Sequence, residues 1–249
     1  MQRYFLDTTV HDGERISLTP AIYHHWVTVL RAEVGAQAEF VDDTAHLFHG
    51  KLLTLDDPAT VALTAVPTPS VELPVDVTIA CGLPKQEKAE WITQKATELG
   101  VTHIIFYGAD WSVAKWQGNK VAKKVTRLTK IAHGAAEQAH RLKRPTVSYA
   151  KNLAAVLNAP HDVAVMAYEE SAKQGEQSAL NQQLQAVKAG QQLLAIFGPE
   201  GGISPAEVTQ AQAANATLVG LGPRILRTET APLYFLAAVS MVLELQQPR

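Results

Sequence analysis

The stretch AIFGPEGGISPAE, from Ala195 to Glu207, joins an apolar run to a glycine-rich turn and then to the start of a helix. Ser204 is expected as the N-cap, Pro205 at the first helical position and Glu207 three residues after the cap, which together form a complete helix start. A strand that leads through a glycine turn into a helix is typical of nucleotide sites. A tight connection without a ligand fits the local pattern equally well.

The turn does not match the known phosphate-binding motifs. It has neither the G-x-G-x-x-G of dinucleotide sites nor the Gly-Lys-Ser/Thr that ends a P-loop. Glu200 stands in the middle of the turn, where its carboxylate would repel a phosphate held by backbone N–H groups. The pattern therefore favours a ligand that carries adenosine or a similar group but no phosphate.

Two domains are indicated by a change of pattern near residue 72. Residues 1–72 contain short period-two segments around one helical patch, Ala21–Arg31, which predicts a small β-barrel. Residues 73–249 alternate apolar runs with helical stretches, which predicts an α/β domain with a mainly parallel sheet and helices on both faces. The runs are Val77–Ala80, His103–Tyr107, Val163–Tyr168, Leu193–Phe197 and Leu218–Leu221.

Composition and the chain ends predict a cytoplasmic protein. The single cysteine, Cys81, excludes an internal disulfide and a cysteine-based metal cluster. The N-terminal residues lack the apolar core of a signal peptide. The apolar segment Pro232–Leu245 is shorter than the roughly 20 residues of a membrane-spanning helix. Its hydrophobic residues occur almost all round the helix, which predicts burial on more than one side and a homodimer.

A second loop, GLGPRILRTETAP (Gly220–Pro232), follows the last predicted strand. Arg224 and Arg227 flank the apolar pair Ile225 and Leu226. Exposed arginines around an apolar pair fit the wall of a pocket with an apolar floor.

Positive charge is concentrated in one segment, although the net charge of the chain is −2. Between Lys120 and Arg144 there are eight basic residues and one acid, Glu137. From Lys120 to Arg141 the apolar residues recur at helical spacing, so the basic residues occupy the other face of a predicted helix. Both a solvated face and a phosphate-binding stripe fit this pattern.

The two loop motifs together resemble the signature pair of the SPOUT class of knotted S-adenosylmethionine-dependent RNA methyltransferases. The resemblance is closest to the branch that makes 3-methyluridine in 16S ribosomal RNA. The segments KQEKAEWITQKATELGV (85–101), AAEQAHR (135–141), RYFL (3–6) and HHWVTVLR (24–31) are also similar to that branch. Where the branch usually carries Arg-Ser after its second strand, this chain has Trp111-Ser112.

The resemblance implies a PUA-like RNA-binding β-barrel in 1–72 and a knotted (trefoil) methyltransferase domain in 73–249. It implies S-adenosylmethionine as methyl donor, no metal, and 16S ribosomal RNA or the small ribosomal subunit as partner. It also implies a homodimer with active sites at the subunit interface. Two alternatives stay open here: a SPOUT enzyme acting on tRNA or ribose, and a non-catalytic ribosome-assembly protein. The second alternative would leave both loop motifs unexplained.

The cofactor is expected in the loops after three strands, where backbone groups can read the adenine edge. The expected residues are Tyr168, Glu169, Phe197, Gly198, Pro199, Glu200, Gly201, Gly202, Ile203, Leu221, Gly222, Ile225, Leu226, Thr228 and Ala231. We expect Gly201→Val to crowd this ligand while leaving the fold intact.

Methylation at uracil N3 requires loss of the imide proton, so a base or a cation that stabilises the imide anion is needed. Arg141, reaching from the partner subunit, and Arg227 are the candidate cations, and Glu229 is the candidate proton acceptor or orienter. Glu229 could equally stabilise the N-terminus of the last helix through the helix dipole. Arg141 could instead bind a phosphate of the RNA. The expected RNA-binding residues are Arg3, Lys120, Lys123, Lys124, Arg127 and Lys130.

Overall fold

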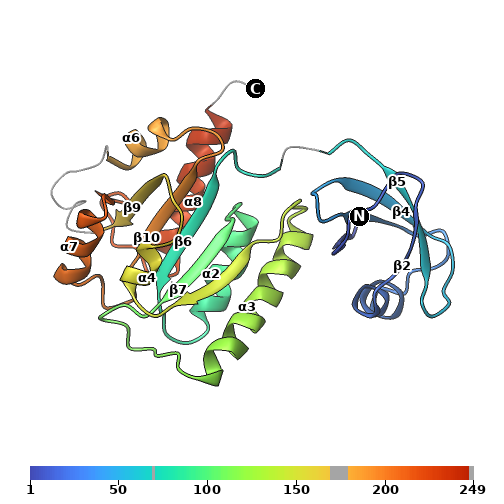
Figure 1. Cartoon of the computed structure of the whole chain (residues 1–249), viewed down its shortest axis with the longest axis horizontal. Coiled ribbons are helices and arrows are strands. Elements are labelled where there is room, and N and C mark those ends of the chain that lie inside the picture. The colour runs from blue at the N-terminus through green and yellow to red at the C-terminus, as the bar shows by residue number, and fades with distance from the viewer. Residues whose placement is uncertain (69–70, 169–178, 247–249) are drawn as a thin grey trace. The chain divides into compact units, whose positions relative to one another are not determined.

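The computed structural model describes residues 1–68, 71–168 and 179–246, and the chain divides into two compact units (Figure 1). The first unit is Met1–Glu72 with Glu137–Lys143, and the second is Leu73–Ala136 with Arg144–Arg249. The short segment Glu137–Lys143 was not expected to belong to the first unit. The expected PUA-like, RNA-binding character of the first unit stays a prediction.

The first unit is a curled five-stranded sheet with one helical segment (Figure 1). Its elements are β1 (Arg3–Phe5), β2 (Arg15–Ser17), α1 (Pro20–Tyr23), the π-helical η1 (His24–Val29), β3 (Gln37–Val41), β4 (Leu47–Leu52) and β5 (Thr60–Ala65). The strand order is β1-β3-β4-β5-β2, with β1 parallel to β3 and the other pairs antiparallel. Tyr4, Trp26 and Phe40 pack in its core with ring centroids 5.8–5.9 Å apart.

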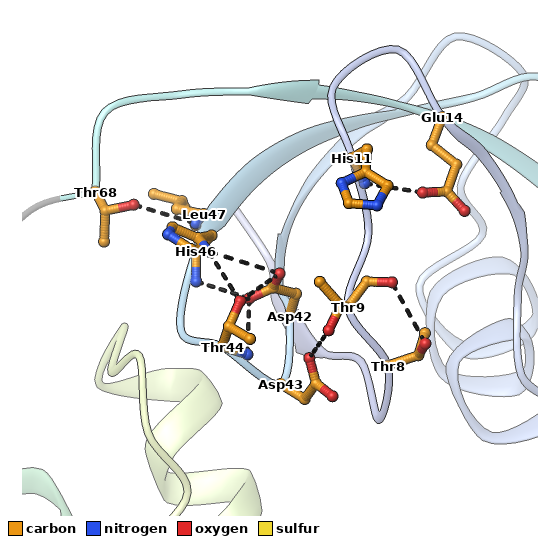
Figure 2. Close-up of polar contacts among 10 residues, drawn as sticks. All are labelled: Thr8, Thr9, His11, Glu14, Asp42, Asp43, Thr44, His46, Leu47 and Thr68. Atoms are coloured by element: carbon orange, nitrogen blue, oxygen red, sulfur yellow. Dashed lines mark hydrogen bonds and ion pairs between the residues drawn. The ribbon is translucent and has the colours of Figure 1, made fainter.

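The turn between β3 and β4 is built around Asp42, as Figure 2 shows. The Asp42 side chain is fully buried and accepts hydrogen bonds from the backbone N–H groups of Thr44 and His46, at 3.0 and 2.8 Å, and from the Thr44 hydroxyl. Burial raises the pKa of Asp42, but these hydrogen bonds outweigh it, so the pKa lies below its usual range. Asp42 is therefore an ionised residue that shapes the hairpin.

The second unit contains a six-stranded sheet in which every neighbouring pair is parallel. Its strands are β6 (Asp76–Gly82), β7 (His103–Tyr107), β8 (Thr146–Ala150), β9 (Val163–Ala167), β10 (Gln192–Phe197) and β11 (Thr217–Val219), in the order β11-β9-β10-β6-β7-β8. Its helices are α2 (Lys88–Glu98), α3 (Asn119–Gln138), α4 (Leu153–Leu157), α6 (Ala179–Ala186), α7 (Pro205–Ala213), α8 (Thr230–Ser240) and the π-helical η2 (Met241–Leu245). The expected parallel sheet is confirmed.

Alternation along the central strands divides the apolar side chains between the two faces of the sheet. Leu193, Ala195 and Phe197 of β10 pack in one cluster with side chains of α2, α3, α6 and α8. Leu194 and Ile196 pack in another cluster with side chains of α4 and α7. Helices therefore cover both faces, as expected, and the loops expected to bind a ligand lie at the strand ends (Figure 1).

The last helix returns from the edge of the sheet to its centre. It follows the edge strand β11 but packs against α2 and β10. Phe235, Leu236 and Val239 are fully buried, whereas Tyr234 and Met241 are 41% and 48% exposed. Among the described residues, no helix has the length and apolar character needed to cross a membrane.

Replacement of Asp42 is expected to destabilise the protein. Asp42→Ala removes the buried acceptor and leaves the N–H groups of Thr44 and His46 unpaired, so the free energy of unfolding should fall by about 1–3 kcal/mol. Asp43→Ala is the matched control, because the neighbouring carboxylate is exposed and accepts only from Thr9 among the described side chains. Chemical denaturation at neutral pH measures both values.

The lowered pKa of Asp42 predicts that its contribution to the free energy of unfolding depends on pH. Because the folded pKa of Asp42 is lowered, its stabilisation is complete above the unfolded pKa, about 3.9, and is lost as the pH falls through the folded pKa. The difference in unfolding free energy between wild type and Asp42→Ala should therefore shrink on acidification below about pH 4. A difference that stays constant down to pH 2 would contradict this assignment.

Candidate functional site

The candidate site lies at one edge of the second sheet. Since β9, β10 and β11 are parallel, their carboxyl ends meet at this edge. Tyr168 follows β9, the turn Gly198–Ile203 follows β10, and the loop Gly220–Glu229 follows β11. The three segments expected to hold the cofactor therefore start from neighbouring strands. Glu169, another expected cofactor residue, lies outside the described residues.

The helix after the glycine turn begins as expected. Ser204 caps α7, accepting from the Glu207 N–H at 3.1 Å, while the Glu207 carboxylate accepts from the Ser204 N–H at 3.0 Å. Both residues are buried. Asp110, after β7, joins this capping box: its carboxylate accepts from the Ser204 hydroxyl at 2.6 Å, and its N–H donates to Glu207 at 3.2 Å. The loop after β7 is thus fixed to the first turn of α7, which directly follows the glycine turn.

Lys88, the first residue of α2, links the two loops that carry the motifs. Its ammonium lies 2.9 Å from Glu200 Oε1 in the glycine turn and 3.0 Å from Glu229 Oε2 at the end of the β11 loop. Glu200 also accepts from the backbone N–H of Lys85 at 3.1 Å. The carboxylate that disfavours phosphate therefore has a structural partner, and α2 ties the two loops together.

The charges in this cluster stabilise one another. The hydrogen bond to Glu200 and the ion pair with Glu229 raise the pKa of Lys88. Burial raises the pKa of Glu229, but the hydrogen bond from its own N–H and the ion pair with Lys88 outweigh burial, so its pKa is lowered. The nearby charge of Arg227 lowers it further. The pKa of Glu200 is lowered in the same way, against the effect of its burial. Both carboxylates are ionised at neutral pH.

The loop after β11 is more open than expected. Ile225 is 78% exposed, and Arg224 and Arg227 are exposed beside it, so Ile225 does not form an apolar pocket floor. Thr228 is buried, while Leu221 and Ala231 are partly buried against the core. Within the described residues, no hydrogen bond joins the N–H groups of Leu221, Gly222, Ile225 or Leu226 to another protein group. These donors can therefore serve a ligand.

A hollow of about 250 Å³ lies beside the β11 loop. It is lined by Leu184 of α6, by Leu221 and Gly222 of the loop, and by Tyr234 and Ala238 of α8. Of the expected cofactor residues that the structure describes, only Leu221 and Gly222 line it, so it flanks the expected pocket.

The space beside Gly201 is filled by the loop after β7. A Cβ at Gly201 would lie 2.9 Å from the carbonyl oxygen of Trp111 and 3.0 Å from its Cβ. The expectation that Gly201→Val would leave the fold intact is therefore wrong, because a valine would displace the loop after β7. Gly202 has φ +84°, a conformation that favours glycine.

Arg141 is a buried residue of the first unit. Helix α3 ends at Gln138, short of the expected Arg141, and His140 adopts φ +54° just after it. Arg141 is 3% exposed and forms an ion pair with Glu72, which also accepts from the N–H groups of Leu142 and Lys143. This geometry gives Arg141 a structural role, so a loss of turnover in Arg141→Ala would also report on folding. Its catalytic role stays a prediction.

Arg3 is also buried and does not fit the expected contact with RNA. It is 3% exposed, lies 2.9 Å from Glu39, and donates to the carbonyl oxygens of His140 and Arg141. Glu39 also pairs with His140 at 2.9 Å. Together these contacts hold Glu137–Lys143 against the first strand of its unit.

The basic side chains of α3 are exposed. Lys120, Lys123, Lys124 and Lys130 form no ion pair among the described residues, and Lys124 lies 5.3 Å from the ring centroid of Trp116. Arg127 differs, because its guanidinium pairs with Glu90 of α2 at 2.9 Å. The basic face therefore has an acidic partner at Arg127, supplied by a residue outside the basic segment.

Lys88 and Asp110 were not identified from the sequence as site residues. Lys88 lies in the segment 85–101 that resembles the family, but its partners are more than 100 residues away in the chain. Asp110 stands beside Trp111-Ser112, where the chain departs from the family pattern. The position of that departure is the signal that could have directed attention to this loop.

Comparisons with known proteins show the family and the fold of the chain. The RNA methyltransferase domain family matches residues 71–240. Ribosomal RNA small subunit methyltransferase E of Bacillus subtilis is 41% identical over 98% of both chains. The structure of ribosomal RNA small subunit methyltransferase E from Neisseria gonorrhoeae bound to S-adenosyl methionine has a TM-score of 0.83, 26% identity, and covers 97% of this chain and 98% of its own.

A second solved structure has the same cofactor. The putative methyltransferase of Legionella pneumophila with bound SAM has a TM-score of 0.83 and 25% identity, and the match covers 96% of both chains. These likenesses confirm the expected α/β fold, with an N-terminal barrel and a C-terminal SPOUT domain.

Removal of the Lys88 ammonium is expected to loosen both loops. Lys88→Met retains most of the aliphatic stem but leaves Glu200 and Glu229 as unpaired like charges, so the free energy of unfolding should fall by roughly 1–2 kcal/mol near pH 7. Backbone hydrogen exchange at 198–203 and 221–231 should become faster. Lys88→Arg should recover part of the protection.

Lys85→Met is the matched control, because Lys85 contacts Glu200 through its backbone N–H, which the substitution keeps. Equal exchange rates in Lys88→Met and Lys85→Met would show that the Lys88 ammonium does not hold the loops.

Proposed function

We propose that this chain, which belongs to the RNA methyltransferase domain family, transfers a methyl group from S-adenosylmethionine to N3 of a uridine in 16S ribosomal RNA. The observation that carries the proposal is the pair of loops after β10 and β11, held together by Lys88 beside the end of β9. The full-length relative from Bacillus subtilis and the cofactor-bound structures support ribosomal RNA as substrate class and S-adenosylmethionine as donor.

The residues at this edge fit the methyl donor. Donors for an adenine edge are available in the unpaired N–H groups of the β11 loop, and Tyr168 and the turn Phe197–Ile203 border the same strand ends. Ile225 and Leu226 offer apolar surface to such a ligand. When bound, S-adenosylmethionine supplies an electrophilic methyl group for in-line displacement.

Arg227 is the residue we propose for stabilising the uracil anion. It is exposed, it lies near Glu229, and its guanidinium can interact with the uracil oxygens as N3 loses its proton. Glu229 is a poor proton acceptor, because its lowered pKa keeps its carboxylate weakly basic. Its ion pair with Lys88 instead supports a role in orienting the loop that carries Arg227.

RNA binding is proposed for the exposed lysines of α3 and for the first unit. Lys120, Lys123, Lys124 and Lys130 can approach phosphates without first breaking an ion pair described here. Arg127 would have to exchange Glu90 for phosphate, so we expect a smaller contribution from it. The small β-barrel is proposed as an additional RNA-binding module.

A homodimer and a cytoplasmic location complete the proposal. The last helix buries Phe235 and Val239 in its own unit but exposes Tyr234, Met241 and Leu245, which supports a second apolar contact. Trp91 on the neighbouring helix α2 is 52% exposed as well. A single buried cysteine is compatible with a reducing compartment.

The proposed reaction can be tested on small ribosomal subunits from cells that lack the protein. Purified protein and S-adenosylmethionine should add one methyl group, which nucleoside mass spectrometry should identify as 3-methyluridine in 16S ribosomal RNA. Calorimetry should detect binding of S-adenosylmethionine alone. Methylation of ribose, or of tRNA in place of ribosomal RNA, would contradict the proposed target.

Neutralising one lysine of α3 should lower the affinity for RNA without slowing methyl transfer. Lys123→Ala removes one phosphate contact, so affinity for ribosomal RNA should fall and the slope of log affinity against log salt should decrease by about 0.7–0.9. Saturating RNA should restore turnover. Lys188→Ala, at an exposed lysine outside α3, is the control. An unchanged salt slope would remove Lys123 from the RNA interface.

Sedimentation tests the proposed dimer. The wild-type protein should sediment as a dimer at micromolar concentration. Met241→Glu places a charge on the exposed side of the last helix, so it should shift the protein toward monomer while circular dichroism stays unchanged. A wild-type monomer at this concentration would contradict the proposal.

A further inference from the structure

Trp111 lies exposed beside the glycine turn of the candidate site. Its side chain is 48% exposed, although tryptophan is among the largest apolar residues. A Cβ placed at Gly202 would lie 3.8 and 3.9 Å from the ring carbons Cζ3 and Cε3 of Trp111. The indole ring therefore borders the turn expected to hold the methyl donor.

The backbone around Trp111 is fixed by its neighbours. Asp110 is bound through its side chain to Ser204 and through its N–H to Glu207. Ser112 donates its N–H to the carbonyl oxygen of Ala109 at 3.0 Å. On the other side, Gly201 leaves no room for a side chain against Trp111. An exposed aromatic ring thus stands on a backbone that is anchored to the capping box of α7.

From this arrangement we propose that Trp111 is a stacking platform for an unpaired base of the RNA substrate, at or next to the nucleotide that is methylated. This inference rests on the proposed function. A planar ring with an immobilised backbone can stack on a base at little cost in conformational entropy. Its position at the strand ends, beside the glycine turn, brings such a base to the edge where the methyl group would be delivered.

The chemistry favours a base over a phosphate as the group that Trp111 contacts. Indole carries no charge and has one N–H donor, so it contributes little to phosphate binding. Its faces are suited to the π-face of any base. The lysines of α3 provide the charge that binds the backbone of RNA, whereas Trp111 provides a contact that salt does not screen.

The test compares two substitutions that differ in planarity. Trp111→Leu keeps an apolar side chain but removes the ring, and Trp111→Phe keeps a ring. Trp111→Leu should weaken binding of 16S ribosomal RNA about tenfold, by the same factor at low and at high salt, whereas Trp111→Phe should lose less than about threefold. The RNA should also quench the fluorescence of the wild-type protein more than that of Trp111→Phe.

Val113→Ala is the matched control, because Val113 is 70% exposed on the same segment but is not aromatic. The inference would be overturned if the Trp111→Leu variant bound RNA as tightly as the wild-type protein. It would also be overturned if the leucine and phenylalanine variants lost RNA affinity equally. A loss of RNA affinity that sedimentation traces to dissociation of a dimer would overturn it as well. If the wild-type protein neither binds nor methylates the RNA, the proposed function itself fails.

Discussion

The ammonium of Lys88 lies between two carboxylates that belong to different loops, and the shape of the site depends on this contact. Without a cation, Glu200 and Glu229 would repel one another at partly buried positions, where water screens charge poorly. With Lys88 between them, the turn after β10 and the loop after β11 are joined to the start of α2. The strand order alone puts these loops at one edge of the sheet, and the ion pairs determine how they face that edge.

A second set of contacts fixes the other end of the glycine turn. Ser204 and Glu207 close the capping box of α7, and Asp110 extends it to the loop after β7. The turn Phe197–Ile203 is therefore held at Glu200 by α2 and at Ser204 by α7. A turn held at two points can present its backbone groups in one arrangement before a ligand arrives, which lowers the entropy lost on binding.

The sequence predicted the local features well and the long-range pairs poorly. The helix start at Ser204 and the strand His103–Tyr107 were predicted because each depends on residues within one short segment. Strand β8 was missed, because Val147 is its only buried residue and the alternation is too short to recognise. Arg141 was predicted as a catalytic cation because methylation at N3 calls for one; its ion pair with Glu72, 69 residues earlier, cannot be recognised from charge patterning. Family resemblance supplied the function, which periodicity alone left open.

The distribution of charge explains how a chain with net charge −2 can suit an RNA substrate. Excess positive charge from Lys120 to Arg144 leaves the rest of the chain clearly negative, so phosphates are attracted to one helix and repelled elsewhere. Arg141 belongs to this excess, but it is buried in an ion pair with Glu72, and Arg3, far away in sequence, is buried in an ion pair with Glu39. The charge available to RNA is therefore smaller than the sequence indicates. The exposed ring of Trp111 beside the glycine turn offers a base a contact that does not depend on this reduced charge.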